Sequence, residues 1–301
     1  MPYNQLFNPP DTFTVPAIPG KEPRPGDQRE GRVYVYDKTI VLAVNVALAT
    51  SRPLLIYGPS GAGKSSLARN IAHFKKWRFV ERVITSRTQA RDLLYDVDLL
   101  KRLHNAQAAA VTRQAFDDDM AKYIVPGPLW WAFDRMSARE FAPEPVWEHD
   151  HDRAVVLLDE IDKADPDVPN NLLVPLGSLG FEVEPIGRSI TVEPDRTPLV
   201  VLTSNEERQL PPAFLRRCVE LRIEVDRSRL LQIAKAHFPT RDPWVEEVGA
   251  LVLPAENVTA PLPSPAEFVD WLRACDKLGR EDWKSIKDIV ISSTRPGGDV
   301  R

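Results

Sequence analysis

One glycine-rich stretch has the residue types and spacing to hold a phosphate chain. The pattern GxxxxGK[ST] spans Gly58–Ser65 between an apolar run and a helical pattern, where its glycines let backbone N–H groups point at phosphate oxygens. The lysine can reach the β- and γ-phosphates, and the hydroxyl after it can bind Mg²⁺. We therefore predict that ATP and Mg²⁺ are bound here, with Lys64 also acting in catalysis and Ser65 as a metal ligand. The predicted binding residues are Gly58, Pro59, Ser60, Gly61, Ala62, Gly63, Lys64, Ser65 and Ser66.

Two carboxylates follow a second apolar run, Ala154–Leu158. An apolar strand that ends in acidic residues places them at the carboxyl edge of a parallel sheet, where such folds bind ligands. Asp159 is suited to coordinating Mg²⁺, and Glu160 is suited to acting as the general base for a water molecule. We expect Asp162 and Lys163, which come next, to be capping and surface charges.

An amide and a pair of arginines complete the set of residues that could do chemistry. Asn205 follows the apolar run Pro198–Thr203 and could orient the attacking water, although asparagine at a strand end is also typical of a turn. Arg216 and Arg217 could stabilise negative charge in the transition state. The alternative for this pair is a solvated position at a helix C-terminus, which the helix dipole favours.

Short apolar runs separated by helical patterns predict the scaffold that positions these residues. The expected strands are Leu54–Tyr57, Phe79–Thr85, Ala154–Leu158 and Pro198–Thr203. The expected helices are 38–50, which precedes the first strand, and Lys64–Phe74 and Arg91–Ala110, which lie between strands. This alternation predicts an α/β fold whose parallel sheet is covered by helices on both faces. Phe181–Glu193 reads as a hairpin turning at Ile186-Gly187. After Val225 the pattern is helical, over 227–237, 243–252, 265–277 and 281–291.

Composition and pattern divide the 301 residues into three predicted parts. Residues 1–33 are rich in proline and read as an extended arm, either a disordered tail or a strap along a neighbouring surface. Residues 34–226 are expected to form the nucleotide-binding domain, and 227–301 a small helical lid domain. The net charge of -4 disfavours nucleic acid or a membrane surface as a partner. With two cysteines, no secretory signal and no run long enough to span a bilayer, we expect a cytoplasmic protein.

Four sequences in order, GPSGAGKSS, VVLLDEID, VLTSN and LPPAFLRRC, resemble those of AAA+ ATPases. The segment PGPLWWAF, Pro126–Phe133, is similar to one in the MoxR-like subgroup, and the resemblance extends over about 34–291. It implies that Gly58–Ser65 is the Walker A loop, that Asp159 and Glu160 form Walker B, and that Asn205 is sensor 1.

The same resemblance implies assembly. AAA+ proteins form rings, usually of six subunits, with each ATP at an interface between two of them. Arg217 is the better match for the arginine finger, because it directly precedes the residue that begins the next strand, and Arg216 is the reserve. The hairpin 181–193 resembles a pre-sensor insertion of the family.

Two stretches depart from the family pattern. Ala266 stands where a second sensor arginine is expected at the start of a lid helix, and Arg273 on the same helix is a substitute. Residues 134–153 look like an insertion, and their run His149-Asp150-His151-Asp152 raises the question of a metal. Four consecutive residues cannot easily face one ion, so we do not predict a metal site from the run.

The resemblance implies a chaperone-like remodelling ATPase that acts on a partner protein, commonly one with a von Willebrand A domain. A motor or loader ATPase of a nucleic-acid-processing or restriction and defence complex is the alternative. The acidic net charge and the single basic residue of the hairpin, Arg188, argue against it. A scaffold that binds ATP but barely hydrolyses it is a third hypothesis, which the intact Lys64, Asp159 and Glu160 disfavour.

Overall fold

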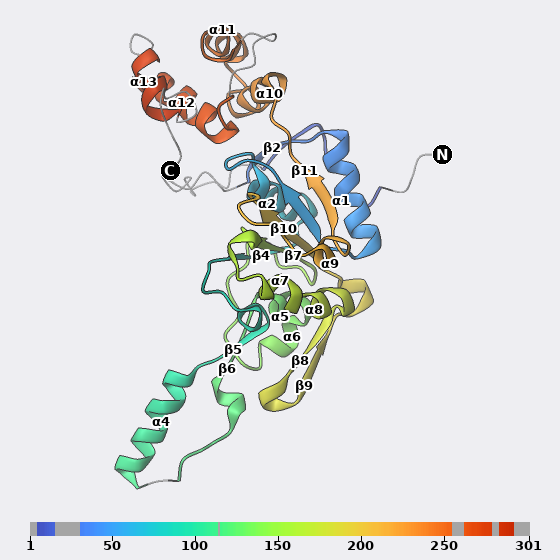
Figure 1. Cartoon of the computed structure of the whole chain (residues 1–301), viewed down its shortest axis with the longest axis vertical. Coiled ribbons are helices and arrows are strands. Elements are labelled where there is room, and N and C mark those ends of the chain that lie inside the picture. The colour runs from blue at the N-terminus through green and yellow to red at the C-terminus, as the bar shows by residue number, and fades with distance from the viewer. Residues whose placement is uncertain (1–4, 16–30, 114, 255–261, 279–282, 292–301) are drawn as a thin grey trace.

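The computed structural model describes residues 5–15, 31–113, 115–254, 262–278 and 283–291. Figure 1 shows a sheet in the middle of an elongated molecule. A group of helices at the C-terminal end of the chain lies beyond one end of the sheet. Helix α4 (Leu99–Thr112) and the hairpin of β8 (Gly180–Val183) and β9 (Arg188–Thr191) lie beyond the opposite end.

Five parallel strands form the central sheet, in the order β11–β3–β10–β7–β4. They are β3 (Leu54–Tyr57), β4 (Arg78–Val83), β7 (Ala154–Asp159), β10 (Leu199–Ser204) and β11 (Val219–Arg222). Every residue of β7 and β10 is buried, because helices cover both faces of the sheet. The parallel α/β fold predicted from the apolar runs is therefore confirmed.

Alternate residues of each strand pack into two separate cores. On β7, Val155 and Leu157 pack against helices α1 (Lys38–Thr50) and α2 (Lys64–Lys75). Val156 and Leu158 face the other core, which is formed with α5 (Pro128–Phe133), α7 (Asp167–Asn171), α8 (Leu173–Ser178) and α9 (Pro212–Leu215). The two tryptophans of α5 are both buried in this core.

The helix predicted over Arg91–Ala110 is wrong as one element. The chain forms α3 (Ala90–Leu94), then the short strand β5 (Tyr95–Val97), and only then α4. β5 pairs antiparallel with β6 (Ile124–Pro126), and this pairing interrupts the helix. The predicted apolar face is also divided, since Leu93 is fully buried whereas Leu100 is 71% exposed. A sequence pattern cannot reveal that a distant segment will pair with the middle of an expected helix.

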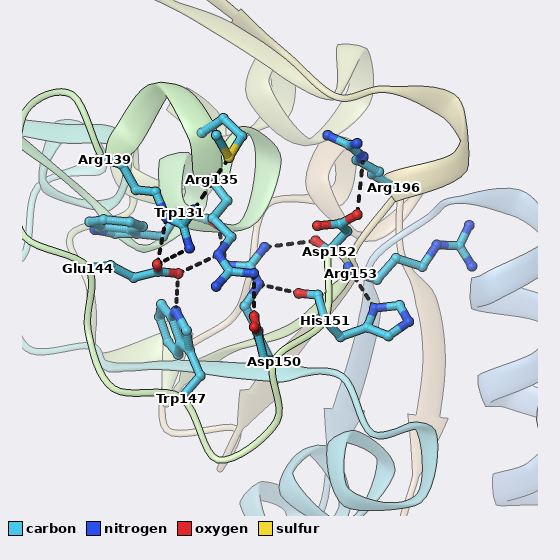
Figure 2. A network of polar contacts seen from close by, with 12 residues as sticks. Trp131, Arg135, Arg139, Glu144, Trp147, Asp150, His151, Asp152, Arg153 and Arg196 are labelled. Carbon is cyan, nitrogen blue, oxygen red and sulfur yellow. Dashed lines mark hydrogen bonds and ion pairs between the residues drawn. The ribbon is translucent and has the colours of Figure 1, made fainter.

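The stretch 134–153 is attached to the sheet through Arg78, the first residue of β4. Figure 2 shows the polar contacts around His151 and Asp152 in this stretch. This side chain is fully buried, and it donates to the carbonyl oxygens of Trp131, His151 and Asp152 at 2.7–2.8 Å. Burial, and then the charge of Arg135 on α6 (Arg135–Ala138), lower the pKa of Arg78 to about 10. Arg78 thus holds the stretch through backbone carbonyl oxygens.

In the described part of the chain after the sheet, four helices share a core of their own. They are α10 (Arg227–His237), α11 (Asp242–Val252), α12 (Pro265–Leu278) and α13 (Trp283–Val290). Asp226, at the expected domain boundary, caps α10 by accepting from the backbone N–H of Arg229 at 2.7 Å. The guanidinium of Arg229 reaches back and pairs with Asp37, the N-cap of α1, at 2.7 Å.

The described part of the N-terminal arm packs against the rest of the same chain, at β2 and α1. Strand β1 (Thr12–Thr14) pairs antiparallel with β2 (Val33–Val35). Phe7 is fully buried, and its backbone exchanges two hydrogen bonds with the side chain of Asn45 on α1. The remainder of the predicted arm, 1–4 and 16–30, lies outside the described residues.

Two further findings bear on the sequence expectations. Cys218 and Cys275 are both buried and are free thiols. Among the described residues, no helix combines the length and apolar character needed to cross a bilayer.

Candidate functional site

The loop Gly58–Ser65 connects the end of β3 to the start of α2, at the carboxyl edge of the sheet. Gly61 and Gly63 have φ angles of +76° and +90°, which L-residues with a side chain rarely adopt. A Cβ at Gly61 would also lie 2.8 Å from Oγ of Ser264, the residue before α12. The sequence therefore needs glycine here both for the turn and for the close approach of the C-terminal helices.

Lys64 is the first residue of α2 and is only 6% exposed. Its Nζ donates to the carbonyl oxygens of Gly58 and Pro59 at 2.7 and 2.9 Å, and to Oδ1 of Asn205 at 2.7 Å. Burial lowers the pKa of Lys64, while the nearby carboxylate of Asp159 opposes the shift. The ammonium group of Lys64 thus lies at the loop, where it is hydrogen-bonded to neutral oxygens rather than to a carboxylate.

Asp159 ends β7 beside the loop and is 2% exposed. Its Oδ1 accepts from Oγ of Ser65 at 2.7 Å and from Oγ of Thr203 at 2.6 Å. The two residues predicted to bind a metal therefore touch each other. Thr203, on β10, was not predicted, because a threonine inside an apolar strand has no sequence signal that distinguishes it from β-propensity.

Glu160 follows in the left-handed region, with φ +62°. Its backbone N–H donates to Thr203 Oγ at 2.9 Å, which helps to fix this conformation. The carboxylate accepts from Lys163 Nζ at 2.8 Å and from Nδ2 of Asn205 at 3.3 Å. Non-glycine residues in such strained conformations cost about 1–3 kcal/mol and gather at functional sites.

The expectation of a capping or surface charge at Asp162 is wrong. Asp162 is 2% exposed, and its Oδ2 accepts from the backbone N–H groups of Asn205 and Glu207 at 3.2 and 2.9 Å. The side chain therefore fixes the turn that carries Asn205. Lys163 is partly exposed and pairs with Glu160, which raises the pKa of the lysine.

A pocket lies next to the loop, between β2 and the C-terminal helices. It is lined by Val33, Tyr34, Val35, Gly61, Ala62, Gly63, Ser66, Arg229, Ile233, His237, Pro265, Ala266, Val269 and Asp270. Ser66 of the predicted set lies here rather than at the carboxylates. Ala266, where the family pattern places an arginine, also lines the pocket. Arg273, the proposed substitute, is not among the lining residues, and its Nη1 lies 3.4 Å from Oδ1 of Asp270. Sequence reasoning missed the pocket, because its walls come from segments about 200 residues apart.

Arg217 lies at the opposite edge of the sheet from the phosphate loop. β11 runs parallel to β3 with Val219 opposite Leu54, so the residues before Val219 lie beside the beginning of β3. The four residues of β3 place the loop about 13 Å further along. The side chain of Arg217 is exposed, and its Nη1 donates to the carbonyl of Leu173 at 3.2 Å. Arg217 is thus not brought together with the other site residues of its own chain.

The backbone around Arg217 is fixed by Arg52, which precedes β3. The Arg52 guanidinium donates to the carbonyl oxygens of Arg216 and Cys218 at 2.7 and 2.6 Å, and to that of Arg217 at 3.2 Å. A planar group with five donors suits such a cluster of carbonyls.

The donor set at the loop fits a magnesium nucleotide. Ser65 and Asp159 offer hard oxygen ligands, which Mg²⁺ prefers. The glycine loop and the N-terminus of α2 offer backbone N–H groups for phosphate oxygens.

The comparison with known families points in the same direction. Residues 53–218 match the family described as AAA domain (dynein-related subfamily). This range includes the loop, both carboxylates, Asn205 and the arginine pair. Among solved structures, the chain is similar to a mutant of RuvB from Thermotoga maritima, with 14% identity and a TM-score of 0.47, over 84% of this chain and 68% of that one. No curated protein matches the chain.

Proposed function

Because the chain belongs to the dynein-related subfamily of AAA domains, we propose that it binds ATP with Mg²⁺ at the phosphate loop and hydrolyses it. One observation carries this proposal. The amide of Asn205 accepts from Lys64 and donates to Glu160, so a single side chain joins the phosphate-binding cation to the general base. A purely structural turn does not need this double contact.

Each residue of the cluster then has a chemical role. Lys64 neutralises phosphate charge, and Ser65 and Asp159 would hold Mg²⁺, which stabilises the charge that develops on the phosphates. Glu160 accepts the proton of the attacking water, and Asn205 keeps its carboxylate in position. Thr203 supports both carboxylate residues through its hydroxyl.

We place the nucleoside in the pocket between β2 and the C-terminal helices. The pocket adjoins Gly61–Gly63 and has apolar walls, including Val33, Ile233 and Val269. Apolar walls suit an aromatic base, because burying its ring faces removes apolar surface from water. Helices α10–α13 would then act as a lid that contacts the nucleotide, with the Arg229–Asp37 pair as one link to the nucleotide-binding domain.

We also propose a ring in which Arg217 serves the neighbouring subunit. Arg217 is exposed at the far edge of the sheet, so it cannot serve the loop of its own chain without a large rearrangement. A head-to-tail contact would bring this edge to the neighbour's nucleotide, and such contacts close into rings when the rotation per subunit is right. Six subunits is the number expected from the AAA+ resemblance.

For the work done by the ring, we propose chaperone-like remodelling of a partner protein in the cytoplasm, of the MoxR type, with a von Willebrand A domain protein as one such partner. The alternative, a motor or loader on nucleic acid, needs free basic side chains on the elements that contact the phosphate backbone, such as the β8–β9 hairpin. Arg188, the only basic residue of the β8–β9 hairpin, is paired with Glu140 at 2.6 and 2.9 Å. This pairing favours a protein client over nucleic acid.

The test is the ATPase rate per subunit as a function of protein concentration, with Arg217→Ala beside the wild type. We expect specific activity to rise with concentration in the wild type and to stay low in the variant. Arg216→Ala is measured in parallel, since Arg216 is the reserve candidate for the finger, and the variant that loses the activity identifies the finger. An active monomer, or equal activity in Arg217→Ala, would contradict the ring mechanism.

Two further measurements separate the remaining hypotheses. Glu160→Gln should retain ATP and lose turnover if the protein is a hydrolase, whereas a nucleotide-gated scaffold would be indifferent to the change. Stimulation of the ATPase by DNA or RNA would favour the motor or loader alternative.

A further inference from the structure

Three potential metal ligands meet at the end of helix α2, away from the phosphate loop. His73 lies in the last turn of this helix, and Glu148 and His149 lie in the stretch between α6 and β7. One donor atom from each of the three residues lies within 4.8 Å of the other two. The chain bends at 148–149, which lets two consecutive side chains face the same point.

Polar atoms of the three side chains lie close to one another within this cluster. Nδ1 of His73 is 3.7 Å from Oε1 of Glu148. The His73 and His149 rings stand at 89° to each other with their centroids 5.6 Å apart. Nε2 of His149 is buried and has no hydrogen-bond partner among the described residues. A buried ring nitrogen without a partner is costly, and a bound cation would remove that cost.

We propose that His73, Glu148 and His149 bind a divalent transition metal ion of the zinc class. Two imidazole nitrogens and one carboxylate oxygen are a donor set that suits Zn²⁺, whereas Mg²⁺ prefers oxygen ligands. In a tetrahedral site with bonds of about 2.1 Å, the donors are about 3.4 Å apart, so the cluster must contract slightly. Glu148 can move to do this, because its side chain is 40% exposed. The exposed side leaves the fourth position to water.

The flanking backbone holds the two ligands of the stretch in place. Asp150 pairs with Arg135 at 2.6 Å, and the next two carbonyls accept from the buried Arg78 (Figure 2). The site is therefore built on a fixed segment and on a helix. A metal here would tie the last turn of α2, whose first turn carries Lys64 and Ser65, to the stretch that leads into β7.

The experiment measures Zn²⁺ binding to the full chain by calorimetry, with Mg²⁺ in large excess so that the phosphate loop does not compete. Bound metal is counted by elemental analysis, and Co²⁺ is used in parallel to report tetrahedral coordination through its visible absorption. The variants are His149→Ala, His73→Ala and Glu148→Gln. His104→Ala is the matched control, because it removes an exposed histidine on α4 outside the cluster.

We expect one tightly bound Zn²⁺ per chain in the wild type and in His104→Ala. Losing a group that only supports a metal ligand already weakens metal affinity roughly 10–100-fold. Each variant that lacks a ligand should therefore bind Zn²⁺ at least about tenfold more weakly. His149→Ala is the decisive variant. Because His149 is partly exposed, the variant should fold normally, and its circular dichroism spectrum should match that of the wild type. No binding by the wild type, or equal binding by His149→Ala, would overturn the proposal.

Discussion

The contact of Asn205 with both Lys64 and Glu160 makes a quantitative prediction for the variant Asn205→Ala. The change removes one hydrogen bond at 2.7 Å and one at 3.3 Å, each to a charged group. A hydrogen bond to a charged group contributes about 1.5–3 kcal/mol. If one such contribution is lost in the transition state, kcat should fall roughly 10- to 150-fold. ATP affinity should change little, because the loop, Ser65 and Asp159 remain.

The assay measures kcat from steady-state ATP hydrolysis at saturating ATP, and the Kd of a fluorescent nucleotide separately. Asn170→Ala is the matched control, since its amide lies on the exposed surface of α7 at 3.4 Å from the carbonyl of Pro166. Asn205→Asp can still accept from Lys64 but cannot donate to Glu160, so it separates the two contacts. A kcat within about twofold of the control for Asn205→Ala would refute the reasoning.

Three other predictions follow from contacts outside this bridge. Arg52→Lys should lower the ATPase rate about tenfold without weakening ATP binding, because lysine cannot reach the three carbonyls beside Arg217 together; unchanged turnover would separate Arg52 from catalysis. Gly61→Ala should weaken nucleotide binding roughly 5- to 30-fold, since a side chain in the left-handed region costs about 1–2 kcal/mol and its Cβ would meet Ser264, whereas Gly177→Ala, with open space around it, should bind normally. Burial, and then the charge of Arg273, lower the pKa of His237 from 6.5 to about 4. Below pH 6.5 the unfolded chain therefore binds the proton more readily than the folded chain. The free energy of unfolding that depends on neutral His237, up to about 3 kcal/mol, is full above pH 6.5 and is lost as the pH falls to 4. Urea unfolding at about pH 7 and pH 4.5 should show a larger loss for the wild type than for His237→Gln.

Local patterns predicted much of the sheet and the phosphate loop. The apolar runs ending at Tyr57 and Leu158 are strands within one residue of their predicted bounds, since short continuous apolar runs are typical of buried strands in a parallel sheet. Glycine at these positions of Gly58–Ser65 predicts a backbone that other residues rarely adopt, and Gly61 has the positive φ that glycine permits.

Contacts between distant segments had no such local signal. The expected helix over Arg91–Ala110 is divided, because Tyr95–Val97 pairs with Ile124–Pro126. Asp162 reads as a surface charge, yet it is buried under the turn that carries Asn205. In both cases the deciding partner lies about 30 to 45 residues away in the chain.

The sequence by itself determined which chemistry this chain can carry, since Lys64, Asp159 and Glu160 have few other uses in that order and context. Only the tertiary structure decided how these groups meet. Parallel strands bring their carboxyl ends to one edge, so Asn205 can bridge Lys64 and Glu160, whereas the register of β11 against β3 leaves Arg217 at the other edge. The physical reason is that residue types fix which interactions are available, while packing of the whole chain fixes the distances over which they act.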